Sequence, residues 1–126
     1  MTYLIDTHIL IWRISSSPLL SSKAIAEIDD TENTIVISKA SLWEIAIKVS
    51  LKKLEIGIQF SELEEYLQKK DILVLDFTYQ ELDQLITLPQ YHRDPFDRLI
   101  ISQAITNNLT IITDDKKFSL YPVQLL

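Results

Sequence analysis

Thr34-Ile35-Val36-Ile37-Ser38 is a short apolar run rich in β-branched residues, and a helical pattern follows it over residues 40–51. Such a run predicts a buried strand. The same alternation of strand and helix recurs along the chain, with further strands predicted at Thr2–Asp6, Ile72–Leu75, Leu109–Thr113 and Val123–Leu125. Short strands that are apolar on both faces and separated by helices are typical of parallel sheets. We therefore expect a central parallel sheet of about four to five strands, covered on both sides.

The helices are predicted from amphipathic patterns and from side chains that favour helix starts. Ser61 and Glu64 have the spacing of a capping box, in which each side chain accepts a hydrogen bond from the other residue's backbone N–H. Thr78 and Glu81 repeat that spacing. Besides the helix at residues 40–51, the predicted segments are Thr7–Ile14, Lys23–Asp30, Ser61–Lys70, Thr78–Thr87 and Pro95–Asn107. The predicted fold is of the α/β class, and the length fits a single domain over residues 1–126.

Composition excludes several kinds of site. The chain has no cysteine, which excludes disulfides, thiol nucleophiles and zinc–thiolate centres. Gly57 is the only glycine, whereas glycine-rich phosphate loops and dinucleotide-binding motifs need several glycines at fixed spacing. The net charge of −6 argues against broad electrostatic binding of nucleic acid, which normally uses clustered Lys and Arg. It does not exclude an enzyme that contacts phosphate through bound cations.

The hydrophobic content of 47% is high enough to bury a core, so we expect a folded protein. No basic and apolar leader precedes the first predicted strand. No apolar stretch approaches the roughly 18 residues needed to span a membrane. We therefore expect a cytoplasmic protein without membrane contact.

Acidic residues follow the predicted strands, and active sites of open parallel sheets form beyond the carboxyl ends of the strands. Six acidic residues can converge on that edge: Asp6, Glu44, Asp94, Asp97, Asp114 and Asp115. Several carboxylates packed together cannot all stay ionised without compensation, and Mg²⁺ or Mn²⁺ supplies it because hard divalent cations prefer oxygen ligands. A metal held in this way activates a water and stabilises charge on a phosphoryl group. The pattern therefore predicts phosphodiester hydrolysis.

Each acid also has an ordinary structural explanation. Asp6 and Asp94 have the positions of helix caps, and the acids after the fourth predicted strand are common turn residues. Glu44 and Lys48 form an i,i+4 pair, which is typical of a solvated helix surface. The neighbours of Glu44 are apolar, however, which predicts a buried carboxylate that needs a partner. The joint pattern, rather than any one acid, supports the metal site.

The remaining polar and aromatic residues carry less information. His8 and His92, the two histidines, fit no catalytic or metal-binding spacing, and we interpret them as packing or hydrogen-bonding residues. Arg98 is expected to bind phosphate or to pair with a neighbouring acid. Trp43 is interpreted as a core residue.

Four segments resemble the four motifs of PIN domains, in the family's order and over nearly the whole chain. They are Leu4-Ile5-Asp6-Thr7-His8, SKASLWEIAIK at residues 38–48, HRDPFDRLIISQA at residues 92–104, and Thr113-Asp114-Asp115 with Phe118 after it. Together these motifs are specific, whereas each alone is weak. The chain is most similar to the VapC-like toxin branch of bacterial toxin–antitoxin systems.

The resemblance implies a PIN-like three-layer α/β/α fold and an endoribonuclease that cuts RNA with bound Mg²⁺ or Mn²⁺. It also implies a small cognate antitoxin as partner, and a homodimer. Carried over motif by motif, the catalytic and metal-binding acids are Asp6, Glu44, Asp97 and Asp115. The neighbouring alternatives in the third and fourth motifs are Asp94 and Asp114. The positions where the family often has a hydroxyl that orients a carboxylate are occupied by Ser38 and Thr113.

Three other classes share part of this pattern. A receiver-like signalling domain would use Asp76, after the third predicted strand, as its phosphate acceptor. Such a domain should show paired acids after its first strand, where Thr7 and His8 follow Asp6 instead. A haloacid-dehalogenase-like phosphatase needs a second Asp at the position of His8. The last alternative is a binding module that kept the PIN-like fold and lost the chemistry.

Overall fold

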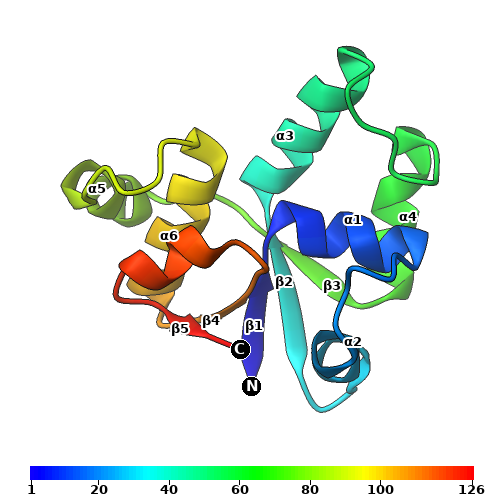
Figure 1. Ribbon diagram of the computed structural model, residues 1–126, viewed down its shortest axis with the longest axis horizontal. Coiled ribbons are helices and arrows are strands. Elements are labelled where there is room, and N and C mark those ends of the chain that lie inside the picture. Colours follow the sequence, from blue (N-terminus) through cyan, green and yellow to red (C-terminus); the bar gives the residue numbers. More distant parts are fainter.

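One parallel sheet with helices on both faces forms the protein, whose computed structural model describes residues 1–126. The strands are β1 Thr2–Ile5, β2 Thr34–Ser38, β3 Ile72–Leu75, β4 Thr110–Ile112 and β5 Gln124–Leu125. They pair in the order β3-β2-β1-β4-β5 (Figure 1). The helices are α1 Thr7–Ser15, α2 Ser22–Asp29, α3 Lys39–Ser50, α4 Leu63–Lys69, α5 Tyr79–Thr87 and α6 Pro95–Asn107, with 3₁₀ helices η1 Phe60–Glu62 and η2 Lys116–Leu120. The predicted α/β fold with a central parallel sheet is confirmed. None of the helices combines the length and the apolar character that crossing a membrane requires.

The central strand β1 pairs with β2 on one side and with β4 on the other. Leu4 lies opposite Val36 of β2 on one side and opposite Ile111 of β4 on the other, and both pairings are parallel. The N–H of Asp6 extends the second pairing, because it donates to the carbonyl of Ile112 at 3.1 Å. The carboxyl ends of β1, β2 and β4 therefore lie side by side. Helices α1 and α3 begin at this edge, directly after β1 and β2.

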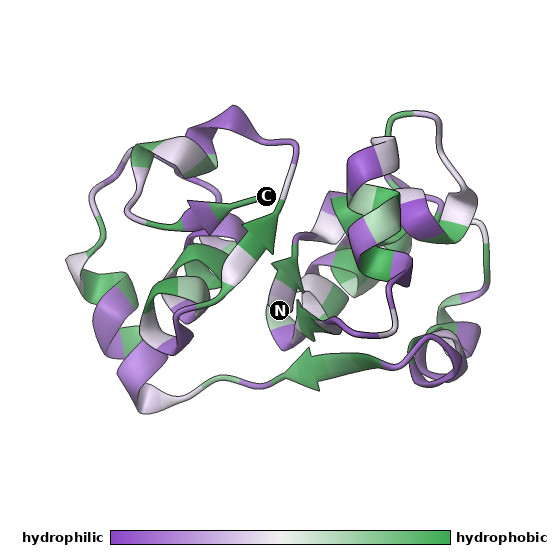
Figure 2. Ribbon diagram, turned by 90° about the horizontal axis from the view of Figure 1, so that it is seen from below, coloured by the Kyte–Doolittle hydropathy of each residue, from purple (hydrophilic) through white to green (hydrophobic).

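Alternate residues of the central strands contribute to two hydrophobic cores. Tyr3 and Ile5 pack with apolar residues of α1, α2, α3 and α4, whereas Leu4 packs with those of α6 and η2. Leu4, Ile5 and Ile111 are 0% exposed. Complete burial of a Leu or Ile side chain contributes roughly 1.5–3 kcal/mol each, so these strands anchor both layers. Figure 2 shows the strands mainly in the hydrophobic colour and the connecting loops largely in the hydrophilic one.

The edge strand β3 departs from the prediction of a sheet covered on both faces. Leu73 is 57% exposed and Val74 is 45% exposed. β3 pairs only with β2, and after Leu75 the chain runs to α5, which packs against α6 at the other end of the molecule (Figure 1). Leu73 is in register with Val36 and lies on the face that α6 covers elsewhere, but the connection leads away from β3, so no helix covers Leu73. Val74 points to the opposite face, where it lines an open hollow beside α4. The prediction of a sheet covered on both faces is wrong for this strand.

The two predicted capping boxes have different outcomes. Thr78 Oγ1 accepts from the Glu81 N–H at 3.2 Å, and Glu81 Oε1 accepts from the Thr78 N–H at 2.9 Å, so the box that opens α5 is confirmed. The predicted box at Ser61 is wrong, because Ser61 lies inside η1. The observed box lies two residues earlier: Glu62 accepts from the Gln59 N–H at 3.1 Å. Glu62 and Glu64 could each close a capping box, and the 3₁₀ turn before α4 favours the one with Glu62.

Replacing Thr78 with Ala should lower the free energy of unfolding by about 1 kcal/mol, because the Glu81 N–H loses its capping acceptor. The matched replacement of Ser61 with Ala should change it by no more than a few tenths of a kcal/mol. Urea denaturation of both variants measures the difference. Equal destabilisation by the two replacements would contradict the assignment of the caps.

Candidate active site

Asp6 ends the central strand and connects it to β4. Its Oδ1 accepts from the Ile9 N–H at 2.9 Å, which caps α1, and its Oδ2 accepts a hydrogen bond from the Thr113 hydroxyl. Thr113 Oγ1 also accepts from the Asp115 N–H at 3.0 Å. Burial raises the pKa of Asp6, whereas the hydrogen bonds from Thr113 and Ile9 oppose that rise. The Asp6 carboxyl is therefore fixed at both oxygens and remains close to its neighbouring acid, Asp115.

Glu44 reaches the same edge from α3. It is 3% exposed, which confirms that its apolar neighbours bury it. The Thr7 hydroxyl donates to Glu44 Oε1 at 2.7 Å, and Lys48 Nζ lies 2.7 Å from Glu44 Oε2. The hydrogen bond to Glu44 raises the pKa of Lys48, which therefore stays charged. Ser41 Oγ lies 2.8 Å from Thr7 Oγ1 and extends this network.

Asp97 lies in the first turn of α6, and its pKa is strongly raised. Its pKa is raised from an ordinary value of 3.8 to about 8, first by burial and then by the charges of Asp94, Asp6, Glu44 and Asp115. Those acids come from the ends of β1 and β4, from α3, and from the residue before α6. The coupling shows that the topology brings these segments close enough to repel one another.

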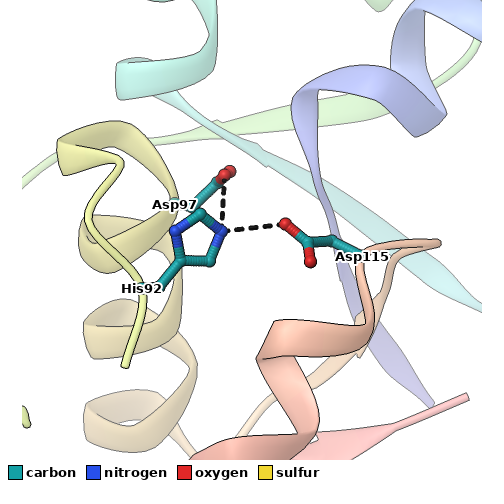
Figure 3. Close-up of side chains that lie close together, drawn as sticks. All are labelled: His92, Asp97 and Asp115. Atoms are coloured by element: carbon teal, nitrogen blue, oxygen red, sulfur yellow. Dashed lines mark hydrogen bonds and ion pairs between the residues drawn. The ribbon is translucent and has the colours of Figure 1, made fainter. Parts of the chain in front are cut away.

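His92 joins two of these acids, as Figure 3 shows. His92 Nε2 lies 2.8 Å from Asp115 Oδ2 and 3.1 Å from Asp97 Oδ2. One oxygen or nitrogen atom from each of the three residues lies within 4.8 Å of the other two. Burial acts to raise the pKa of Asp115, but hydrogen bonds from the Lys117 N–H and from His92 hold it below its ordinary value.

The alternative residues of the third and fourth motifs occupy other positions. Asp94 Oδ1 accepts from the Phe96 N–H at 2.9 Å and from the Asp97 N–H at 3.1 Å, so this side chain caps α6 beside the cluster. Asp114 is exposed, and it lines a separate hollow between α1 and α2. Ser38 Oγ accepts from the Ala40 N–H at 3.1 Å, which caps α3, and none of its hydrogen bonds goes to a carboxylate.

Two residues differ from their sequence-based interpretation. Arg98 neither binds an acid nor faces solvent: it is buried and donates to backbone carbonyls, including that of Pro89 at 2.8 Å. Trp43 is 61% exposed and packs edge-to-face on Phe96, with ring centroids 5.3 Å apart, so the prediction of a core residue is wrong. His92 does pack and hydrogen-bond, as interpreted, but the sequence did not predict that its partners are two of the acids. Its place two residues before Asp94 was the available signal.

The donor set fits a hard divalent cation. Of Asp6, Glu44, Asp97 and Asp115, only Glu44 pairs with a Lys or Arg side chain. The others are crowded, partly or fully buried, and offer oxygen atoms, which Mg²⁺ and Mn²⁺ prefer. A cation here would relieve the repulsion that raises the pKa of Asp97.

Comparison with solved structures finds proteins of the same fold. A chain of the VapBC2 complex of Rickettsia felis, solved bound to a promoter DNA fragment, has 27% identity and a TM-score of 0.76, covering 100% of this chain and 98% of that one. A chain of VapBC-1 from nontypeable Haemophilus influenzae has 22% identity and a TM-score of 0.72, covering 100% and 97%. A chain of a Klebsiella pneumoniae toxin–antitoxin complex has 20% identity and a TM-score of 0.67, covering 98% and 95%. Among curated proteins, none matches the sequence.

The family comparison is more specific than the likeness of folds. The sequence matches the PIN domain over residues 3–123, a span that includes all four motifs of the acidic edge. The resemblance drawn from the motifs is thereby confirmed, and the receiver-like and phosphatase alternatives no longer apply. This chain belongs to the PIN domain family.

Proposed function

We propose that this PIN domain is a metal-dependent endoribonuclease that hydrolyses phosphodiester bonds of RNA. Asp6, Glu44, Asp97 and Asp115 hold Mg²⁺ or Mn²⁺ in this proposal. The observation that carries it is the environment of Asp97, whose pKa is raised to about 8 by burial and by the surrounding acids. Proteins rarely collect unpaired carboxylates in this way unless a cation or a reaction uses them. The family membership supports the same conclusion.

The cation, when bound, supplies an activated water at neutral pH and charge stabilisation on the phosphoryl group. The residues of this chain orient the acids that hold it. Thr113 and the Ile9 N–H fix the two oxygens of Asp6, and Thr7 and Lys48 fix those of Glu44. Asp97 keeps a proton in the metal-free protein at neutral pH and releases it when a cation binds.

The proposal extends to the biological setting of the nuclease. Several similar solved structures are complexes of a toxin with its antitoxin. We propose that this chain is likewise the toxin of such a pair, acting in the cytoplasm as a homodimer and inhibited by a small cognate antitoxin. The match over residues 3–123 supports one nuclease domain over residues 1–126. The remaining alternative is a PIN-like binding module without catalysis. It predicts that the folded protein cleaves no RNA with either metal.

Purified protein should cleave a mixed RNA pool with Mg²⁺ or Mn²⁺, and EDTA should abolish the cleavage. Replacing Asp6 with Asn should reduce the rate by more than the roughly 10–100-fold that loss of an outer hydrogen-bond partner costs. The fold should persist, because Asn still accepts from the Ile9 N–H and the replacement removes one repelling charge. Gel analysis of the RNA products measures the rate. Wild-type cleavage by the Asp6→Asn protein would exclude this site, and no cleavage by folded, inhibitor-free wild-type protein would favour the binding module.

The neighbouring acids of the fourth motif provide a matched pair of variants. Asp115→Asn should reduce cleavage by at least about 100-fold, because Asp115 faces His92 and the other acids. Asp114→Asn should leave the rate within about threefold, since this side chain is exposed on another surface. Both variants lose the same charge, so a difference between their cleavage rates reflects the position of the replaced residue. A larger loss from Asp114→Asn would assign the fourth motif in the other register.

Stability of the metal-free protein should fall as the pH rises. The pKa of Asp97 is about 8 in the folded state and near its ordinary value of 3.8 in the unfolded state, so the folded state binds the proton more tightly. This contribution is fully present below about pH 4 and is lost by about pH 8, with a slope of at most about 1.4 kcal/mol per pH unit. Asp97→Asn should reduce the slope, as measured by urea denaturation in EDTA. An unchanged slope in that variant would contradict the assignment.

A further inference from the structure

We propose that His92 is a positioning residue of the active site, whose Nε2–H group binds Asp115 and fixes that carboxyl beside Asp97, without binding the metal or transferring a proton. This inference rests on the proposed function, because the two acids are candidate ligands. It assigns a role to the one residue of the cluster that is neither acidic nor part of the expected ligand set. His92 is 6% exposed, so its contacts are fixed by the protein rather than by solvent.

The hydrogen bonds of His92 define the tautomer of its imidazole ring. His92 Nδ1 accepts a hydrogen bond from the Asp94 N–H at 3.2 Å. A ring nitrogen that accepts from an N–H carries no proton, so the proton of the neutral ring is on Nε2. Nε2 in turn faces two acceptors, Asp115 Oδ2 at 2.8 Å and Asp97 Oδ2 at 3.1 Å. Nε2 therefore donates a hydrogen bond to Asp115, lies within ion-pair distance of Asp97, and is oriented by the backbone N–H of Asp94 on the other side of the ring.

The same geometry argues against His92 as a metal ligand. A neutral imidazole binds a metal through its unprotonated nitrogen, and here that nitrogen is Nδ1, which faces the backbone of Asp94. Histidine ligands usually donate their second ring N–H to an acceptor, whereas the group beside Nδ1 is a donor. It also argues against proton transfer, because the Nε2 proton is held in the hydrogen bond to Asp115, which the cation would need in ionised form.

The loop that carries His92 is held rigidly from within the protein. The His92 N–H donates to the Tyr121 hydroxyl at 2.8 Å, and that hydroxyl donates to the Pro89 carbonyl at 2.7 Å. Arg98 donates to the Pro89 carbonyl at 2.8 Å and to the His92 carbonyl at 3.4 Å. Phe118 packs edge-on to the imidazole, with ring centroids 5.8 Å apart. Arg98 also donates to the carbonyls of Leu85 and Leu88 at the end of α5, so this buried arginine fixes the His92 loop to that helix.

The Nε2–H group of His92 reduces the repulsion between Asp97 and Asp115. Asp97 on α6 and Asp115 after β4 belong to separate segments and repel each other when both are ionised. Hydrogen bonds to ionised groups are about twice as strong as neutral ones, so the N–H that binds Asp115, with Asp97 Oδ2 3.1 Å from the same nitrogen, opposes that repulsion at short range. At Asp115 it occupies one direction of Oδ2, and the Lys117 N–H occupies one of Oδ1, which leaves other lone pairs of both acids for a cation.

Two variants of similar size separate positioning from other roles. His92→Leu removes the donor, whereas His92→Gln keeps an N–H₂ group at a similar reach and cannot act as an acid, a base or an imidazole ligand. The affinity for Mn²⁺, measured by calorimetry, and the rate of RNA cleavage should fall about 10–100-fold in His92→Leu. His92→Gln should recover most of both losses. A Gln variant as impaired as the Leu variant, or a Leu variant equal to wild type, would overturn the positioning role.

The tautomer can be read directly in the wild-type protein, whatever the variants do to folding. The chain has two histidines, so long-range ¹H–¹⁵N spectra contain two imidazole patterns, and His92→Gln removes one of them. The expected pattern for His92 is a protonated Nε2 and an unprotonated Nδ1, both without metal and with saturating Mg²⁺. A proton on Nδ1, or loss of the Nε2 proton when Mg²⁺ binds, would show that His92 is a ligand and overturn the inference. Wild-type protein that binds no Mg²⁺ or Mn²⁺ and cleaves no RNA would instead defeat the proposed function, and the role of His92 would fall with it.

Discussion

The parallel pairing of β1 between β2 and β4 is the constraint on which the acidic edge depends. A parallel sheet places the carboxyl ends of neighbouring strands at one edge, and the register of Leu4 with Val36 and Ile111 fixes how far each end projects. A one-residue slip of either pairing would turn every inward side chain of the slipped strand to the opposite face. The two cores and the acidic cluster are therefore consequences of the same register, and neither can be altered without the other.

Folding works against the charges that the register brings together. The two cores contribute most of the stability, and the cluster opposes it, as the raised pKa values of Asp6 and Asp97 indicate. Hydrogen-bond donors offset part of this repulsion at Asp6, Glu44 and Asp115, and Lys48 also forms an ion pair with Glu44. The Asp97 side chain accepts no such hydrogen bond, and burial together with the neighbouring acids raises its pKa to about 8. Local conflict within an otherwise consistent sequence is the usual mark of a functional site.

Local patterns predicted the strands, most helix bounds and the acids that follow the strands, because β-branched runs and strand ends are visible in the sequence itself. Features that depend on distant segments were not visible. Burial of Arg98 against the loop before α6 and the exposure of Trp43 follow from how α5, α6 and α3 pack. His92 gains its role only because Asp115, which lies 23 positions further along the chain, folds back beside it. The capping box near Ser61 depends on local sequence, but that sequence allows two registers, because Glu62 and Glu64 each have a polar residue three positions earlier.

The bond between Thr113 and Asp6 joins residues 107 positions apart. Contacts between such distant residues form late, because closing a long loop costs entropy before any contact compensates it. During synthesis, the first strand and its acid exist long before β4 can insert beside them. A partly made or truncated chain that lacks the β4 segment therefore has no assembled acidic edge. The order of segments therefore delays assembly of the acidic edge until nearly the whole chain is present.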